Sequence, residues 1–165
     1  MGAVVMTVAL LIGMMLMIPF ASQDASAASG NWFTSTLDSE NDVGLYTSIA
    51  VDSGGNRHVS YYDESFGRLM YAYTSDGVWL IKICDNVGNV GQYSSIAVDS
   101  ADNVHISYYD ATNGDLKYVR TQNGTWQQPV TVDSTGNVGQ YTSIALDLSD
   151  KAHISYYDTT NGDLK

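Results

Sequence analysis

The chain has little cysteine, proline or positive charge. Its 165 residues include one Cys and two Pro, and seven Lys or Arg stand against eighteen Asp or Glu. A single cysteine, Cys84, excludes a disulfide within the chain. The basic residues are scattered singly in a net charge of −11, which excludes nucleic acid as a partner, because phosphate binding needs clustered Lys and Arg. No long stretch has the helical spacing of apolar residues, so an all-β fold is expected.

The one long apolar run is at the amino terminus, over residues 3–20. It is followed by Ala25-Ser26-Ala27, which has the small-x-small pattern of a signal-peptidase site. We interpret residues 1–27 as a secretory signal peptide and expect a secreted, extracellular or cell-surface protein. An uncleaved membrane anchor is the alternative, since the run is long enough to span a bilayer.

The rest of the sequence repeats. YTSIAVDSGGNRHVSYYD, YSSIAVDSADNVHISYYD and YTSIALDLSDKAHISYYD begin at Tyr46, Tyr93 and Tyr141, with spacings of 47 and 48 residues. The tryptophans follow the same period, at Trp32, Trp79 and Trp126. Cys84 occupies the position of Leu37 and Val132, so it is predicted to be a small core residue rather than a reactive thiol.

Each period divides into four runs with β propensity. In the middle copy these are residues 93–99, 104–110, 115–121 and 125–133, separated by Gly, Asn, Asp and Ser. The short connections predict a four-stranded antiparallel meander. Such a sheet has two faces to bury and cannot do so alone, so the copies must stack, and this repeat length is typical of the blades of a β-propeller.

The repeat also predicts the domain organisation. We expect a leader at residues 28–45 that carries the fourth strand of a ring-closing blade, blade 1 at 46–92, blade 2 at 93–140 and a partial blade 3 at 141–165. Closed propellers have about four to eight blades. The sequence is therefore expected to be an incomplete, amino-terminal piece of a longer protein.

Two segments resemble known propeller families. TSDGVW (residues 74–79) and TQNGTW (residues 121–126) resemble a shortened Asp-box, the SxDxGxTW turn of sialidase-like (BNR) propellers. AVDSGGNRHVS and AVDSADNVHIS are similar to the first hairpin of NHL repeats. The resemblance implies propeller architecture. In a sialidase it would also imply an arginine cluster for the substrate carboxylate, whereas this chain has only Arg57, Arg68 and Arg120.

HISYYD combines a histidine, a serine and an aspartate, as a catalytic site would. However, His105 and Ser107 would share one face of a strand while Asp110 would point to the other, so they do not form a triad. A structural role is favoured, because each histidine follows an aspartate by six residues across a predicted turn. We expect these pairs to hydrogen-bond: Asp52 with His58, Asp99 with His105, and Asp147 with His153.

No cofactor is expected. One His and one Asp in each repeat do not make a compact zinc site. Calcium is the alternative, with oxygen ligands from Asp85, Asn89, Asp133 and Asn137, although the same residue types are common in turns.

The candidate ligand face is the edge where inner strands begin and the second-to-third turns emerge. It would carry Tyr46, Gln92, Tyr93, Gln140 and Tyr141, with Asp63, Asp110, Asn113, Asp158 and Asn161 in the turns. Tyrosine with amides and carboxylates suits carbohydrate; the alternative is that these side chains only pack and turn.

The sequence therefore predicts a module for extracellular binding or adhesion, with glycans as the leading ligands and surface proteins as other partners. The alternatives are a sialidase-like or other polysaccharide-active enzyme with catalytic residues outside this sequence, and a purely structural surface repeat.

Overall fold

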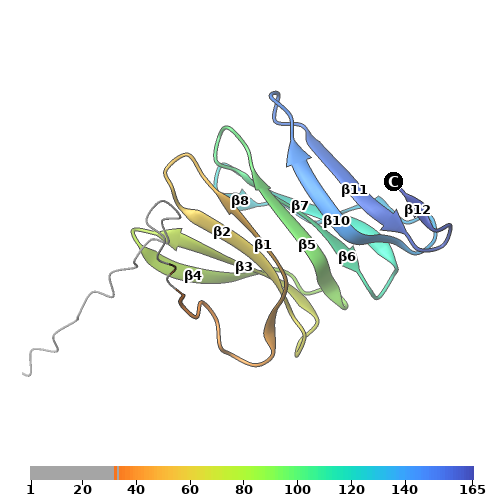
Figure 1. Cartoon of the computed structure of the whole chain (residues 1–165), viewed down its shortest axis with the longest axis horizontal. Helices are drawn as coiled ribbons and strands as arrows, with labels where there is room; N and C mark the ends of the chain where they lie inside the picture. The colour runs from red at the N-terminus through yellow and green to blue at the C-terminus, as the bar shows by residue number, and fades with distance from the viewer. Residues whose placement is uncertain (1–31, 33) are drawn as a thin grey trace, which may run out of the picture.

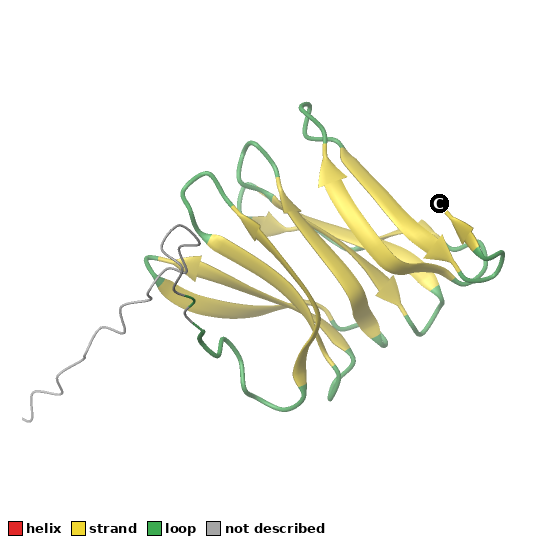
Figure 2. Cartoon of the chain, in the orientation of Figure 1, coloured by secondary structure: helices red, strands yellow, loops and turns green. Residues whose placement is uncertain are grey.

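The described part of the chain is entirely β. The computed structural model describes residue 32 and residues 34–165, so the predicted signal peptide lies outside the described residues. Twelve strands form three antiparallel sheets, and no helix occurs among the described residues (Figures 1 and 2). It follows that no helix in this part of the chain is a candidate for crossing a membrane.

The first sheet is a four-stranded meander, as expected for one period. Its strands pair in the order β1-β2-β3-β4. Their bounds are β1 Val43–Val51, β2 Arg57–Asp63, β3 Arg68–Ser75 and β4 Val78–Asp85.

The second sheet differs from the predicted meander in its last strand. It contains β5 Val90–Val98, β6 Val104–Asp110, β7 Asp115–Gln122, β8 Thr125–Trp126 and β9 Val130–Asp133. Both β8 and β9 pair with β7, so the expected fourth strand is interrupted. Pro129 lies in the gap, where it has no N–H to donate, and this copy has one residue more between its tryptophan and its aspartate than the first copy has.

The third sheet has three strands, β10 Val138–Leu146, β11 Ala152–Asp158 and β12 Asp163–Leu164. The first strands of the three sheets, β1, β5 and β10, lie side by side (Figure 1). Turns tie the sheets together at one end: Asp102 accepts a hydrogen bond from the Ser53 amide (2.9 Å), and Asp150 accepts one from the Ser100 amide (3.0 Å).

The segment before β1 has no strand among its described residues. Residue 32 and residues 34–42 contain no strand, and the earlier part of the predicted leader lies outside the described residues. Even so, Leu37 packs against the cluster that contains Val59 and Tyr61, and Asp38 accepts a hydrogen bond from the Tyr61 hydroxyl (2.7 Å). These side chains make the contacts of a fourth strand without a β-ladder beside them.

Each inner strand begins three residues before the tyrosine at which it was expected to start. In β5 and β10 the added residues contain a glycine that the packing requires. Gly91 has φ of +105°, and a Cβ on it would lie 2.7 Å from the Leu69 Cα of the preceding sheet. Gly139 meets Leu116 at the same distance. A side chain at either position would separate two neighbouring sheets.

The main core lies between the first two sheets. Leu69 and Tyr71 come from the first sheet, and Ile106 and Tyr108 from the second. Cys84 packs against this cluster, which confirms the predicted core position, and burial raises the pKa of its thiol. The thiol is therefore held in its unreactive protonated form.

The turns likened to a shortened Asp-box are two-residue hairpin loops. Asp76 and Gly77 both have positive φ, 51° and 76°, and Asn123 and Gly124 have 51° and 73°. Positive φ at both central residues is the geometry of a type I′ turn, which Asp-Gly and Asn-Gly favour in any hairpin. Local turn chemistry is thus sufficient to explain these motifs.

Candidate ligand-binding site

Three tyrosines, one from each inner strand, come together across the sheets. The ring centroids of Tyr46 and Tyr93 are 4.5 Å apart, and those of Tyr93 and Tyr141 are 4.4 Å apart. Neighbouring rings are tilted by 48° and 49°. Tyr46 is 38% exposed and Tyr141 is 66% exposed. We call Tyr46, Tyr93 and Tyr141 the tyrosine row.

The backbone of the row is left-handed at every member. Tyr46, Tyr93 and Tyr141 have φ of 54°, 55° and 54°. The strand register explains how this arises: β1 advances from Leu45 to Ser48 while β2 moves only from Tyr62 to Ser60, which is a bulge. A bulky side chain in this region is rare and costs on the order of 1–3 kcal/mol, whereas glycine adopts it freely.

A second layer of tyrosines supports the row. Tyr62, Tyr109 and Tyr157 lie with ring centroids 6.0, 6.1 and 6.5 Å from the row members of their own sheets. The hydroxyls of the first two are fixed by the connections between sheets: Tyr62 donates to Asn89 Oδ1 and Tyr109 to Asn137 Oδ1, both at 2.7 Å. The rings of Tyr62 and Tyr109 are thus held in place by the structure itself.

The central tyrosine of the row is affected by both of its neighbours. Burial, and then hydrogen bonds with Tyr141 and Tyr46, raise the pKa of Tyr93 above its ordinary value. Tyr93 therefore stays protonated at neutral pH, and its hydroxyl can both donate and accept hydrogen bonds. Gln92 and Gln140, both half-buried, directly precede two members of the row.

The turn residues assigned to the same face have other partners. Asp110 Oδ1 accepts from the backbone amides of Thr112 (3.0 Å) and Asn113 (3.1 Å), and Oδ2 accepts from the Asn113 side chain (2.9 Å). Asp158 and Asn161 repeat this arrangement. Asp63 is also hydrogen-bonded within its turn, and all three aspartates are buried. These interactions assign five residues to the turns rather than to the site: Asp63, Asp110, Asn113, Asp158 and Asn161.

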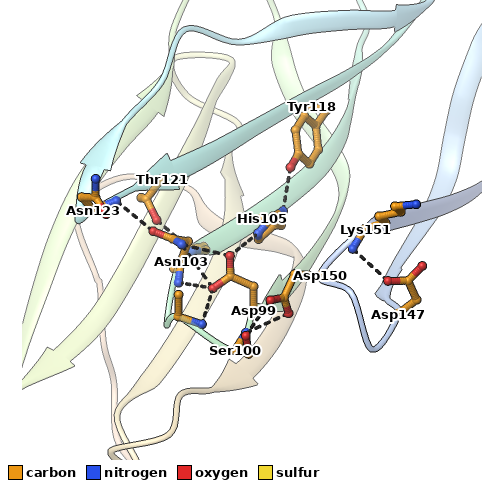
Figure 3. A network of polar contacts seen from close by, with 12 residues as sticks. Asp99, Ser100, Asn103, His105, Tyr118, Thr121, Asn123, Asp147, Asp150 and Lys151 are labelled. Atoms are coloured by element: carbon orange, nitrogen blue, oxygen red, sulfur yellow. Dashed lines mark hydrogen bonds and ion pairs between the residues drawn. The ribbon is translucent and has the colours of Figure 1, made fainter.

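The Asp–His contacts predicted across the first hairpins are present. His58 Nε2 lies 3.2 Å from Asp52, His105 Nε2 lies 3.2 Å from Asp99, and His153 Nε2 lies 3.1 Å from Asp147. Figure 3 shows the middle pair, in which Asp99 also accepts hydrogen bonds from the backbone amide and the side-chain amide of Asn103. Burial alone would raise the pKa of Asp99, but hydrogen bonds from Asn103 and His105 hold it below its ordinary value.

A tyrosine completes each buried pair, and the sequence analysis did not identify it. The Tyr118 hydroxyl lies 2.6 Å from His105 Nδ1 (Figure 3), and the Tyr71 hydroxyl lies 2.5 Å from His58 Nδ1. The signal was available, since both tyrosines follow their histidine by thirteen residues. Both histidines are almost fully buried, so they are placed to hold two strands and a turn together.

Ser107 is engaged away from His105. Its buried hydroxyl accepts a hydrogen bond from the Thr142 hydroxyl of the third sheet (2.8 Å), and Ser60 pairs with Ser94 in the same way (2.9 Å). Each polar residue of the HISYYD repeat that was considered for catalysis thus has a structural partner.

The aspartates and asparagines considered for calcium hold sheets together. Asp85 Oδ2 accepts hydrogen bonds from Tyr108 and Lys117, both at 2.6 Å, and Asp133 is bound in the same way by Tyr156 and Lys165. Asn89 and Asn137 accept from the supporting tyrosines, as described above. Within the described residues, no three His, Cys, Asp or Glu side chains are grouped as a metal site would require.

Comparisons with known proteins identify no family for the chain. No protein-family model matches it, and no curated protein matches it. Among solved structures, it is similar to a fucose lectin from Kordia zhangzhouensis in complex with methyl-fucoside, at 19% identity and a TM-score of 0.48. The similarity covers 72% of this chain and 88% of the lectin chain. A likeness this distant assigns no ligand to the chain.

Proposed function

We propose that the chain is part of a secreted or surface-anchored β-propeller that binds carbohydrate through the tyrosine row. In this proposal the three sheets are consecutive blades, and β1, β5 and β10 are the strands nearest the propeller axis. The observation that carries the proposal is the row itself. Three tyrosines, two of them well exposed, stand 4.4–4.5 Å apart on backbone that glycine would satisfy without strain.

The chemistry of the row suits a sugar. Tyrosine combines an apolar ring, which packs against the C–H face of a pyranose, with a hydroxyl that can exchange hydrogen bonds with sugar hydroxyls. The second layer of tyrosines keeps the rings in place, and an ordered surface loses less conformational entropy on binding. Strain retained at a ligand surface is also a common feature of functional sites.

Binding is favoured over catalysis by the partners of the reactive side chains. His105 is held between Asp99 and Tyr118, and Ser107 is bonded to Thr142. A purely structural role for the row is the competing hypothesis, and it makes a different prediction about stability.

The test replaces Tyr141, the most exposed member of the row, with glycine. Tyr141→Gly removes a ring that is 66% exposed and also relieves the left-handed backbone, so stability should change by less than about 1 kcal/mol. Glycan-array binding should nevertheless be lost or greatly reduced. Asp76→Gly is the matched control, because it relieves a similar φ of 51° in a hairpin turn away from the row and should leave glycan binding unchanged.

The two roles give opposite results. If the row is a ligand surface, Tyr141→Gly should lose glycan binding and keep its stability. The glycan array measures the binding, and denaturant titration measures the stability. Unchanged glycan binding together with a marked loss of stability would show that the row only packs.

A further inference from the structure

The positive charges near the tyrosine row are already paired. All seven Lys and Arg residues of the chain lie within the described residues. Three of them, Arg68, Lys117 and Lys165, are at the end of the sheets where the row lies. The strand register shows this for Arg68. Asp63 is paired with Arg68 on one side and with Val43 on the other, and Val43 lies at the start of β1, three residues before Tyr46.

Each of these cations has a carboxylate within hydrogen-bonding distance. Arg68 Nε lies 2.8 Å from Asp63 Oδ2. Lys117 Nζ lies 2.6 Å from Asp85 Oδ2 and 4.0 Å from Asp110 Oδ2.

Lys165 repeats the arrangement of Lys117 in the third sheet. Its Nζ lies 2.7 Å from Asp133 Oδ2 and 3.7 Å from Asp158 Oδ2. The three cations are therefore surrounded by five carboxylates, which leaves this end of the sheets negative.

The other four basic residues lie elsewhere. Arg57 and Lys151 flank first-to-second turns, at the opposite end of the sheets from the second-to-third turns. The Lys82 ammonium lies over the Tyr73 ring, 5.1 Å from its centroid, and Arg120 pairs in register with His105. An acidic ligand on the row would thus meet carboxylates in excess, and the nearby cations already have partners.

We propose that the tyrosine row accepts uncharged or amino-bearing glycans and rejects glycans that carry carboxylate or sulfate. This inference rests on the proposed carbohydrate-binding function and specifies its ligand class. The physical basis is Coulombic: an anion that reaches the row is repelled by the surplus carboxylates, and this repulsion weakens as salt screens it. The same charges favour a protonated amino sugar.

The experiment compares oligosaccharides that share a backbone and differ in charge. Suitable probes are lactose with 3′-sialyllactose, xylotetraose with its glucuronic-acid-substituted form, and N-acetylated chitotetraose with its deacetylated form. Affinities are measured on the full chain at about 10 mM and about 150 mM salt, where the Debye length is about 30 Å and about 8 Å. In the first two pairs, if either binds, the neutral member should bind about tenfold more tightly than the acidic one at low salt. In the third pair, the deacetylated form with its protonated amines should bind more tightly than the N-acetylated form at low salt. Each difference should narrow at the higher salt.

One substitution tests the charge arrangement directly. Asp133→Asn removes the carboxylate closest to Lys165 but keeps an oxygen that can accept from Tyr156. It should raise affinity for the acidic probes several-fold while leaving the neutral probes unchanged. Asp76→Asn, the matched control, makes the same charge change in the β3–β4 hairpin at the opposite end and should have little effect on either class.

The outcomes separate the two proposals. Acidic probes that bind as tightly as their neutral partners would overturn the charge preference while supporting a carbohydrate site. If no member of any pair binds, the carbohydrate-binding function fails, and the charge preference fails with it.

Discussion

Tyr108 donates a hydrogen bond to Asp85 across the boundary between two sheets, at 2.6 Å. The same contact joins Tyr61 to Asp38 and Tyr156 to Asp133, both at 2.7 Å, and in each case the two residues are 23 positions apart. The chain therefore repeats a polar connection between the end of one unit and the second strand of the next. Apolar packing holds the sheets together, and this connection fixes how they are aligned.

The middle connection should contribute measurably to stability. Tyr108→Phe keeps the ring but removes the buried donor to Asp85, so we expect a loss of about 1–2 kcal/mol in the free energy of unfolding. Tyr156→Phe, the control, removes the same contact where it is more exposed and should cost less. Urea denaturation measures both, and an equal effect of the two variants would contradict the importance of burial here.

Gly91 should be intolerant of any side chain. Gly91→Ala places a Cβ 2.7 Å from the Leu69 Cα and also strains a φ of +105°, so we expect a loss of more than about 3 kcal/mol. Gly44 is the matched control, because its φ is +96° but nothing lies within 4 Å of its Cβ position. Gly44→Ala should show only the backbone cost, about 1 kcal/mol. Similar thermal denaturation midpoints for the two variants would exclude the close approach of the sheets.

The buried histidine should be structural. His105→Phe fits a ring into a similar space but leaves Asp99 and Tyr118 without their shared partner, so we expect a loss of about 2–4 kcal/mol. His153→Phe removes the equivalent contact to Asp147 where both side chains are exposed, and should cost much less because water screens the pair. Guanidinium denaturation of both variants gives the comparison. Two similar losses would show that the hydrogen bonds of His105 contribute little.

Stability should fall in acid. Hydrogen bonds from Asn103 and His105 to Asp99, and from Lys117 and Tyr108 to Asp85, outweigh burial and lower the pKa of each carboxyl below its ordinary 3.8. A lowered pKa in the folded state stabilises the fold above the unfolded-state pKa, and this contribution is lost as the pH falls through the folded-state value. The contribution of these two carboxyls to the free energy of unfolding should therefore be lost as the pH falls below about 4.

Asp85→Asn provides the control for this pH dependence. Because the amide does not titrate, the variant should lose less stability between neutral and acidic pH than the unmodified chain, measured by urea denaturation at each pH. An identical pH dependence in both proteins would mean that Asp85 does not contribute to it.

Much of the architecture could be predicted from the repeat. The period gave the number of strands in a complete unit, their antiparallel order and the Asp–His pairs, because each of these depends on residues close together in the sequence. The interrupted strand at Pro129 was missed, although proline and the extra residue were both visible. The fourth strand expected before Val43 stays a prediction, because such a strand forms only beside the third strand of its own sheet, which the described residues do not supply.

The candidate site could be predicted only in part. Tyr46, Tyr93 and Tyr141 were identified, but so were Asp63, Asp110 and Asp158, which the structure buries in turns. Residue type alone does not distinguish a carboxylate that faces solvent from one that closes its own turn. The contacts of Tyr71 and Tyr118 with the buried histidines were not predicted. They depend on which face of the strand each tyrosine occupies, and residue type does not show this.

The sequence by itself determined the repeating unit: its strands, its turns and the contacts made within each hairpin, all of which depend on local pattern and backbone preference. The tertiary structure decided what lies between units. The close approach at Gly91, the hydrogen bond from Tyr108 to Asp85 and the 4.4–4.5 Å spacing of the tyrosine row exist only because separate sheets stack at one distance and in one alignment. That alignment is set by the fit of side chains more than twenty residues apart, which no local pattern specifies.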